Sequence, residues 1–239
     1  MSAENIFTKK NLDFYLRELA KEYRKLTGKQ TKAEIVLVGG AAVLTNYSFR
    51  EMTTDIDAVI RVSGAMKDAI DHVGDRYHLP NGWLNADFQN TSSYSSELVL
   101  HSEYVCTYSN VLAIRTVRGE YLISMKLVSG RRYKADLSDI VGILYEHQLA
   151  NHPIDLSMIN KAMLDLYGSW DKVDDYSRSV LEKALASSDL KSLFEAQMTE
   201  EVQAKDTILE IDRKYPNFVN VDNINEIIEQ ARRKKEQQS

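Results

Sequence analysis

The chain has 239 residues, of which 44% are hydrophobic and 27% charged, and it contains only three prolines. This composition is typical of an ordinary globular protein with one large domain or two small ones. The net charge of −5 argues against a protein that holds long nucleic acids, such as duplex DNA, by general electrostatic attraction, because such domains usually carry a clear basic excess.

Signals for membranes and secretion are missing from the sequence. No apolar run approaches the roughly 18 residues of a bilayer-spanning helix, and the N-terminal residues lack a basic and then apolar signal pattern. The single cysteine, Cys106, cannot form an internal disulfide, and its neighbours supply no obvious base. We therefore expect a cytoplasmic protein without membrane association, in which Cys106 is a structural thiol.

The first third of the chain predicts alternating helices and strands. Apolar residues at three- and four-residue spacing, short apolar runs and a capping serine carry this prediction. The expected elements are a helix over 11–27, a strand over 35–38, a helix over 41–48, a buried strand over 56–62, and a helix capped by Ser63 that runs to about residue 77.

Later segments change from strands to helices. After a loop over 78–96, strands are expected over 103–108 and 111–116, joined by a tight turn at Ser109-Asn110. The helices that follow are expected over 120–129, 136–148, 155–167, 176–187, 190–213 and 222–235. This order predicts an α+β domain over 1–150 and a C-terminal helical domain over 151–239.

Two glycines and two aspartates stand in an order that suits nucleotide chemistry. Gly39 and Gly40 follow an apolar strand and precede a helix, so backbone N–H groups and a helix N-terminus can meet a triphosphate. Asp55 and Asp57 are two residues apart at the start of the next strand, so both side chains leave one face and can hold a divalent cation. Either motif alone is usually a turn or a solvated edge, and their order is the more specific signal.

Two stretches of the chain resemble known nucleotidyltransferase families. Gly39-Gly40 followed by Arg50-x-x-Thr53-x-Asp55-x-Asp57 resembles the first motif of the DNA polymerase β-like nucleotidyltransferase superfamily, although the gap between Gly40 and Asp55 is slightly long. The second stretch resembles the Glu…Lys and Arg…Asp-x-x-Asp motifs of AbiEii-like toxin nucleotidyltransferases and of the DUF6036 family. It contains Glu120, Lys126, Arg131, Asp136 and Asp139. Trp83-Leu84-Asn85 is similar to a further DUF6036 element.

The resemblance implies a fold, a cofactor and a set of site residues. The fold is a nucleotidyltransferase-type mixed sheet flanked by helices. Asp55 and Asp57 would bind Mg²⁺ in a two-ion site. Nucleotide binding would fall to Gly39, Gly40, Arg50, Thr53, Lys126, Arg131 and Arg132. Asp136 would complete the catalytic set, with Glu120 and Asp139 as further candidates.

A third catalytic carboxylate is harder to place. The strand over 111–116 carries Arg115 in place of an acid, so Glu97, Glu103 and Glu120 are candidates by position only. Glu120 is equally suited to capping a helix. The acids at 136 and 139 share a helix face, and their alternative role is to provide helix N-terminal charge and a salt bridge.

These residues lead us to expect a Mg²⁺-dependent nucleotidyltransferase. It would transfer a nucleoside monophosphate from an NTP to an RNA end, a protein hydroxyl or a small molecule. By resemblance, the acceptor could be a tRNA or a protein, and a toxin or phage-defence role would bring an antitoxin protein as partner. The alternative is a degenerate nucleotidyltransferase fold that binds nucleotide or a partner protein without turnover. A structural scaffold assembled through the helical half is a third reading.

Overall fold

The computed structural model describes residues 6–60, 64–216, 218–220 and 223–236, which form two compact units. Unit 1 comprises residues up to Met125 together with Ser157–Trp170, and unit 2 comprises Lys126–Leu156 and the residues from Asp171 onward. The units are therefore interleaved along the chain, whereas the sequence suggested one boundary after residue 150. That domain boundary stays a prediction. The two compact units do not divide there, because Ser157–Trp170, which follows residue 150, belongs to unit 1.

Unit 1 is built on a mixed sheet with the strand order β5-β4-β2-β7-β6. Its strands are β2 (Ala33–Leu37), β4 (Ile56–Ile60), β5 (Leu84–Asn85), β6 (Ser102–Tyr108) and β7 (Leu112–Val117). The central strand β2 is antiparallel to β4 and parallel to β7. This α+β architecture confirms the expected mixed sheet. The prediction missed β5 inside the expected loop, because a strand of two residues has no periodicity to read.

Helices and a small second sheet complete unit 1. The helices are α1 (Lys9–Thr27), α2 (Gly39–Asn46), α3 (Gly64–Tyr77), the first part of α4 (Gly119–Ser129) and α6 (Leu156–Tyr167). The short strands β1 (Phe7–Thr8) and β3 (Met52–Thr53) pair with each other, and 3-10 turns cover Asp87–Asn90 and Ser96–Val99. Thr8 and Asn11 form a capping box that begins α1. The proposed cap residue of α3, Ser63, lies outside the described residues.

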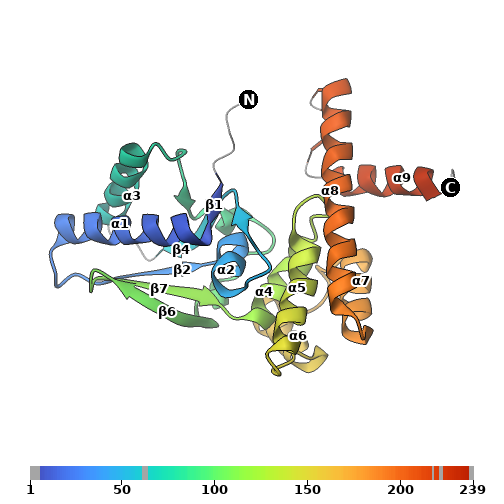
Figure 1. The fold of residues 1–239 in the computed structure, drawn as a ribbon, viewed down its shortest axis with the longest axis horizontal. Coiled ribbons are helices and arrows are strands. Elements are labelled where there is room, and N and C mark those ends of the chain that lie inside the picture. Colours follow the sequence, from blue (N-terminus) through green and yellow to red (C-terminus); the bar gives the residue numbers. More distant parts are fainter. Residues whose placement is uncertain (1–5, 61–63, 217, 221–222, 237–239) are drawn as a thin grey trace. The chain divides into compact units, whose positions relative to one another are not determined.

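The two faces of the main sheet differ in burial. One face carries buried apolar side chains such as Ile35, Leu37 and Ile114, and α1 lies along it (Figure 1). The Tyr108 hydroxyl donates to Asp13 of α1 from this face. The opposite face, here called the open face, carries Asp57, Val59, Val36, Glu34, Ala113, Arg115, Tyr104 and Thr107, as the alternation along the paired strands requires. Most of these residues are half-buried or exposed.

Unit 2 is a group of helices. It contains the end of α4, α5 (Asp136–Leu149), α7 (Asp175–Ala186), α8 (Leu190–Lys214) and α9 (Ile224–Glu236). The apolar residues Leu137, Ile140, Val141 and Leu144 of α5 are all buried. Gly130 ends α4 with a φ of +53°, and an added Cβ would lie 2.7 Å from Asp174 Oδ2, so only glycine fits this turn. None of the helices in the described ranges is both long and apolar enough to cross a bilayer.

Candidate functional site

The predicted site residues form two clusters, one in each unit. The cluster in unit 1 contains Gly39, Gly40, Arg50, Thr53, Asp55 and Asp57, and the cluster in unit 2 contains Lys126, Arg131, Asp136 and Asp139. Arg132 belongs to a separate network in unit 2.

The two aspartates of unit 1 lie where β4 begins. Asp55 directly precedes β4, and Asp57 is the second residue of the strand. The Asp57 carbonyl oxygen accepts a hydrogen bond of 3.0 Å from Val38 N, which ties the acid to the end of β2. Residues two apart in an extended chain point to the same side, so we expect Asp55, just before the strand, to share the face of Asp57. Both residues are half-buried, so solvent can reach them although the backbone at Asp57 is fixed.

Gly39 brings the start of α2 close to Asp57. Its φ of +54° lies in the left-handed region that favours glycine, and an added Cβ would lie 3.5 Å from Asp57 Oδ2. No side chain caps α2, and by helix geometry its first N–H groups have no acceptor within the helix. These donors and the positive end of the helix dipole therefore favour an anion beside Asp57.

Gly40 is required by the packing of Thr53. An added Cβ at Gly40 would lie 2.6 Å from Thr53 Oγ1 and 3.6 Å from Arg50 Nη2. Thr53 is 4% exposed, and its hydroxyl lies 3.1 Å from the Asp55 carbonyl oxygen and 3.2 Å from Asp55 Oδ1. The geometry makes Thr53 a residue that positions Asp55, and its predicted contact with nucleotide stays a prediction.

The donor set in unit 1 suits a hard cation. Carboxylate oxygens are the ligands that Mg²⁺ prefers, and Mg²⁺ commonly binds through one or two carboxylates together with substrate phosphates. Among the residues that the structure describes, no group of three or more His, Cys, Asp or Glu side chains is arranged to hold a metal ion. A pair of aspartates beside a helix N-terminus that favours an anion suits an ion that shares its ligands with a triphosphate.

The cluster in unit 2 is a buried ion-pair network. Lys126 Nζ lies 2.7 Å from Asp136 Oδ1 and 2.9 Å from Asp139 Oδ2. Arg131 contacts the same Asp136 carboxylate through Nε at 2.7 Å, Nη2 at 3.1 Å and its backbone N at 3.3 Å. The Asp136 side chain has no exposed surface, and that of Lys126 is 5% exposed. The Asp136 carboxylate therefore receives four donors from the chain itself.

Burial and charge oppose each other in this network. Burial alone would lower the pKa of Lys126, but the carboxylates of Asp136 and Asp139 outweigh it and the pKa is raised. Burial alone would raise the pKa of Asp136, but Lys126 and Arg131 outweigh it and the pKa falls well below its usual range. Both groups are therefore held in their charged forms, which supports the salt-bridge role that the sequence left open.

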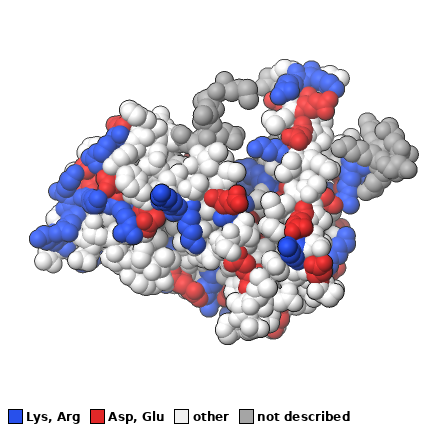
Figure 2. All heavy atoms as spheres, viewed as in Figure 1, with Lys and Arg blue, Asp and Glu red and all other residues white. Residues whose placement is uncertain are grey.

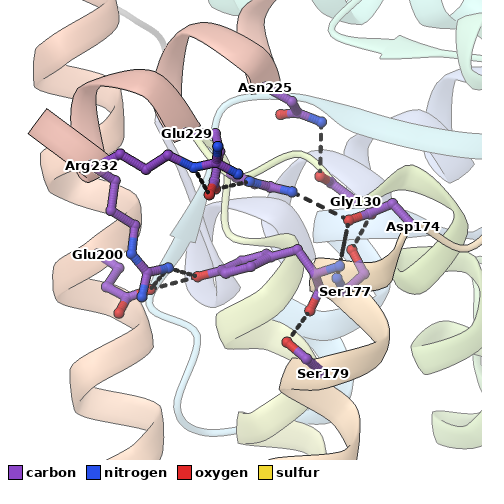
Figure 3. A network of polar contacts seen from close by, with 11 residues as sticks. Gly130, Asp174, Ser177, Ser179, Glu200, Asn225, Glu229 and Arg232 are labelled. Atoms are coloured by element: carbon purple, nitrogen blue, oxygen red, sulfur yellow. Dashed lines mark hydrogen bonds and ion pairs between the residues drawn. The ribbon is translucent and has the colours of Figure 1, made fainter.

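Arg132 was predicted to bind nucleotide, and the structure places it among residues of α7 and α9. Its Nη1 lies 2.8 Å from Glu229 Oε2, and its Nη2 lies 3.4 Å from Asp174 Oδ1. Its guanidinium lies over the Tyr176 ring, 4.1 Å from the centroid. Figure 3 shows this region, with Asp174 just before α7, Glu229 on α9 and Asn225 directed at the Gly130 carbonyl. These contacts connect the turn after α4 to α7 and α9.

Strand β7 supplies no third carboxylate. Its sequence is Leu-Ala-Ile-Arg-Thr-Val, and the residue that shares the face of Asp57 is Arg115, which pairs with Val36. Glu103 pairs with Thr116, so it leaves the opposite face of the sheet and is an unsuitable partner for Asp57.

Glu120 is the better candidate of the remaining glutamates. It follows the C-terminal end of β7, at the same edge of the sheet as Asp57. Its carboxylate lies 3.4 Å from Arg118 Nε, and its side chain is 14% exposed.

One acid of unit 2 was missed by the sequence reading. Glu201 of α8 is 6% exposed, and its Oε1 accepts hydrogen bonds from Leu137 N at 2.9 Å and Ser138 N at 3.1 Å. Burial raises its pKa to about 8. The sequence signal for its burial was its spacing of four residues from Gln197 and three from Ala204, which places all three on one face of α8. That face is buried.

A protein-family model matches most of the chain. A family described as "Nucleotidyltransferase of unknown function (DUF6036)" matches residues 15–185, which is more than half of the chain and includes both clusters. No curated protein and no solved structure matches the chain. From this match, the chain belongs to the DUF6036 family of nucleotidyltransferases.

Proposed function

We propose that the chain is a Mg²⁺-dependent nucleotidyltransferase that transfers a nucleoside monophosphate from an NTP to a hydroxyl group. The observation that carries the proposal is the position of Asp55 and Asp57 beside the glycine-started helix α2, within one compact unit. A carboxylate pair can bind a cation, and a helix N-terminus beside it can bind phosphate oxygens. The cation and the phosphates are the two charged parts of a metal-bound nucleotide.

Each residue of this cluster has a separate task in the proposed reaction. Asp55 and Asp57 would hold Mg²⁺, which offsets negative charge on the phosphate oxygens when bound. The N–H groups at the start of α2 would bind phosphate oxygens, because glycine at positions 39 and 40 lets the backbone approach closely. Thr53 keeps the Asp55 carboxylate in place through the contact between its hydroxyl and Asp55 Oδ1.

The transfer itself exchanges one bond at phosphorus for another. The acceptor oxygen bonds to the α-phosphorus, the bond from that phosphorus to the bridging oxygen breaks, and pyrophosphate leaves. The acceptor proton passes to a carboxylate, for which we propose Glu120, since it lies in the same unit and at the same sheet edge as Asp57. The predicted role of Asp136 as third acid stays an alternative, although its carboxylate already receives four donors.

The proposal is tested with Asp57→Asn and a matched surface control, Asp68→Asn, whose parent residue is exposed on α3 of the same unit. Each variant is incubated with Mg²⁺, each labelled NTP in turn, and pools of cellular RNA and protein as acceptors. We expect Asp57→Asn to lower label transfer and pyrophosphate release by several orders of magnitude, because it removes a charge that holds the cation. Asp68→Asn should behave like the parent. Full transfer by Asp57→Asn, together with a large drop in unfolding temperature, would refute the proposal.

Glu120→Gln tests the proposed base separately. We expect kcat to fall while NTP binding is retained, because the amide cannot accept the proton but leaves the phosphate site intact. Unchanged turnover in this variant would contradict the assignment and return attention to Asp136.

A binding role without turnover is the second candidate function, and the acid-free strand β7 favours it. It predicts that Mg²⁺ and an NTP bind while no pyrophosphate is released with any acceptor pool. A tRNA or protein acceptor, an antitoxin partner, a toxin or phage-defence role and a cytoplasmic location also stay predictions.

A further inference from the structure

The open face of the main sheet carries an exposed aromatic side chain. Tyr104 of β6 is 60% exposed, an unusual state for a large ring in the middle of a strand. It pairs with Arg115 of β7, and Arg115 pairs in turn with Val36 of β2. Paired residues share a face, so Tyr104, Arg115 and the acid at position 57 stand on one side of the same sheet.

Arg115 is held in a defined orientation. Its Nε donates to Ser102 Oγ at 2.8 Å, and its Nη2 donates to the Ser102 carbonyl oxygen. Ser102 pairs with Val117, so these bonds direct the guanidinium toward the C-terminal end of β7. Strand β4 begins at the same edge of the sheet, where Asp55 and Asp57 lie. An arginine fixed by a neutral partner keeps its full charge for an anion.

Positive charge collects at the opposite end of the sheet. Between Lys9 and Lys32 the chain has eight basic and three acidic residues, a net charge of +5 in a protein whose net charge is −5. Arg24, Lys25, Lys29 and Lys32 form the part called here the basic end, and Arg24 and Lys32 of this part contact the turn between β6 and β7. Figure 2 shows Lys and Arg side chains gathered at this end of α1, at the left of the view.

The cations of the basic end are only partly neutralised. Lys25 pairs with Glu22, whereas Arg24 donates to the carbonyl oxygen of Ser109 and Lys32 to that of Asn110. A carbonyl oxygen carries no net charge, so the last two contacts fix these side chains without cancelling their charge. Lys29 is exposed beside them.

We propose that the open face binds the 3′ end of a single-stranded polynucleotide as the acceptor, an inference that rests on the proposed function. Tyr104 would stack on a base, Arg115 would contact a phosphate near the reacting hydroxyl, and the basic end would contact upstream phosphates. The strands separate the basic end from the acids by about 15 Å, which a few nucleotides can span. Exposed aromatic rings combined with cations are the means by which proteins hold single strands without reading their sequence.

Binding in the absence of NTP tests this surface independently of catalysis. Fluorescence anisotropy is measured with single-stranded RNA and DNA oligonucleotides of one sequence, and with the corresponding RNA duplex. We expect single strands to bind more tightly than the duplex. Tyr104→Ala should weaken binding about 5- to 150-fold, the range for loss of one stacked base. Tyr104→Phe, which keeps the ring, and Tyr215→Ala, which removes an equally exposed ring in unit 2, should bind like the parent. Binding of either sugar supports the inference, and the tighter one identifies the natural acceptor.

Salt dependence tests the basic end. Replacing Lys29 and Lys32 by Gln should lower the slope of log K against log salt by about 1.4, since each phosphate contact on a single strand contributes about 0.7. The same change at Lys9 and Lys10, which lie at the other end of α1 and are also exposed, is the charge-matched control and should leave the slope nearly unchanged.

The inference and the proposed function fail in different ways. Absence of oligonucleotide binding at low salt, or equal binding by Tyr104→Ala and the parent, overturns the acceptor surface. Label that enters only protein, and is lost in Asp57→Asn, overturns the acceptor surface while leaving the transferase intact. Oligonucleotide binding that depends on Tyr104 without any label transfer supports the surface and counts against the transferase.

Discussion

Replacing Asp136 with Asn separates a structural from a catalytic role for the buried cluster of unit 2. Asn keeps the size of the side chain and removes its charge. Lys126 would then retain Asp139 as its nearest carboxylate, at 2.9 Å, and the guanidinium of Arg131 would lose a partner that it contacts through two nitrogens. The side chain at 136 has no exposed surface, so water cannot replace the missing charge.

The expected loss of stability is large. Breaking a buried ion pair by removing one partner costs about 3–5 kcal/mol, which corresponds to a drop in unfolding temperature of roughly 6–20 °C for a chain of this size. Asp206→Asn, at an exposed position of α8, is the matched control and should change stability by less than about 0.5 kcal/mol.

The pH dependence of this difference follows from the shifted pKa values. The folded-state pKa of Asp136 is lowered, so its contribution is present above the unfolded value of 3.8 and is lost as pH falls through the folded value. The pKa of Lys126 is raised, so its contribution is present below 10.5 and is lost as pH rises through the folded value. Parent and variant should therefore differ most between about pH 4 and pH 10.

Thermal unfolding by circular dichroism is measured beside pyrophosphate release. We expect the unfolding temperature to fall, with activity at low temperature retained in whatever fraction stays folded. A variant that unfolds at the parental temperature but has lost turnover would show that Asp136 acts in catalysis, as the family resemblance implies. The reasoning from its four donors would then be wrong.

Two further predictions concern single positions. Gly40→Ala should lose about 1–3 kcal/mol of stability, because the new methyl group would lie 2.6 Å from Thr53 Oγ1. Adding Thr53→Ala to Gly40→Ala should recover part of that loss. Gly64→Ala is the control and should lose no stability, because its new methyl group meets no atom within 4 Å. A double variant as unstable as Gly40→Ala alone would contradict the packing argument. Glu201 has a pKa raised to about 8, so the stability it provides is complete below its unfolded value of 4.5 and is lost as pH rises through 8. Glu201→Gln should remove this decline in unfolding temperature between pH 5 and 9, and a parent protein without any decline would show that the carboxyl is not protonated near neutral pH.

Local signals in the sequence account for the elements that were predicted well. The tight turn between β6 and β7 has φ values of +51° at Ser109 and +57° at Asn110, the left-handed conformation that a two-residue hairpin turn requires. The stop at Gly130 depends on one residue with a φ of +53°. Apolar periodicity carried the helices and the longer strands, because burial of one face repeats along the chain.

Features that depend on distant partners could not be read in this way. Arg132 lies 97 residues from Glu229, and nothing near either residue indicates the ion pair that joins them. The sequence assigned Lys126 to nucleotide binding and Asp136 to catalysis, because a resemblance to family motifs cannot distinguish a carboxylate that acts in catalysis from one that is already held by two cations. That distinction needs the burial and the donor distances, which only packing determines.

The route of the chain between the two units constrains the order in which the protein can fold during synthesis. Unit 1 is interrupted after Met125 and is completed by Ser157–Trp170. The buried Tyr121 donates to Asp165 Oδ2 at 2.6 Å, and Tyr167 donates to the Ser93 carbonyl oxygen at 2.6 Å. The sheet and its acids can therefore leave the ribosome early, but unit 1 cannot close until Trp170 has followed. A nascent chain that stalls before this point would expose part of its core to chaperones and proteases.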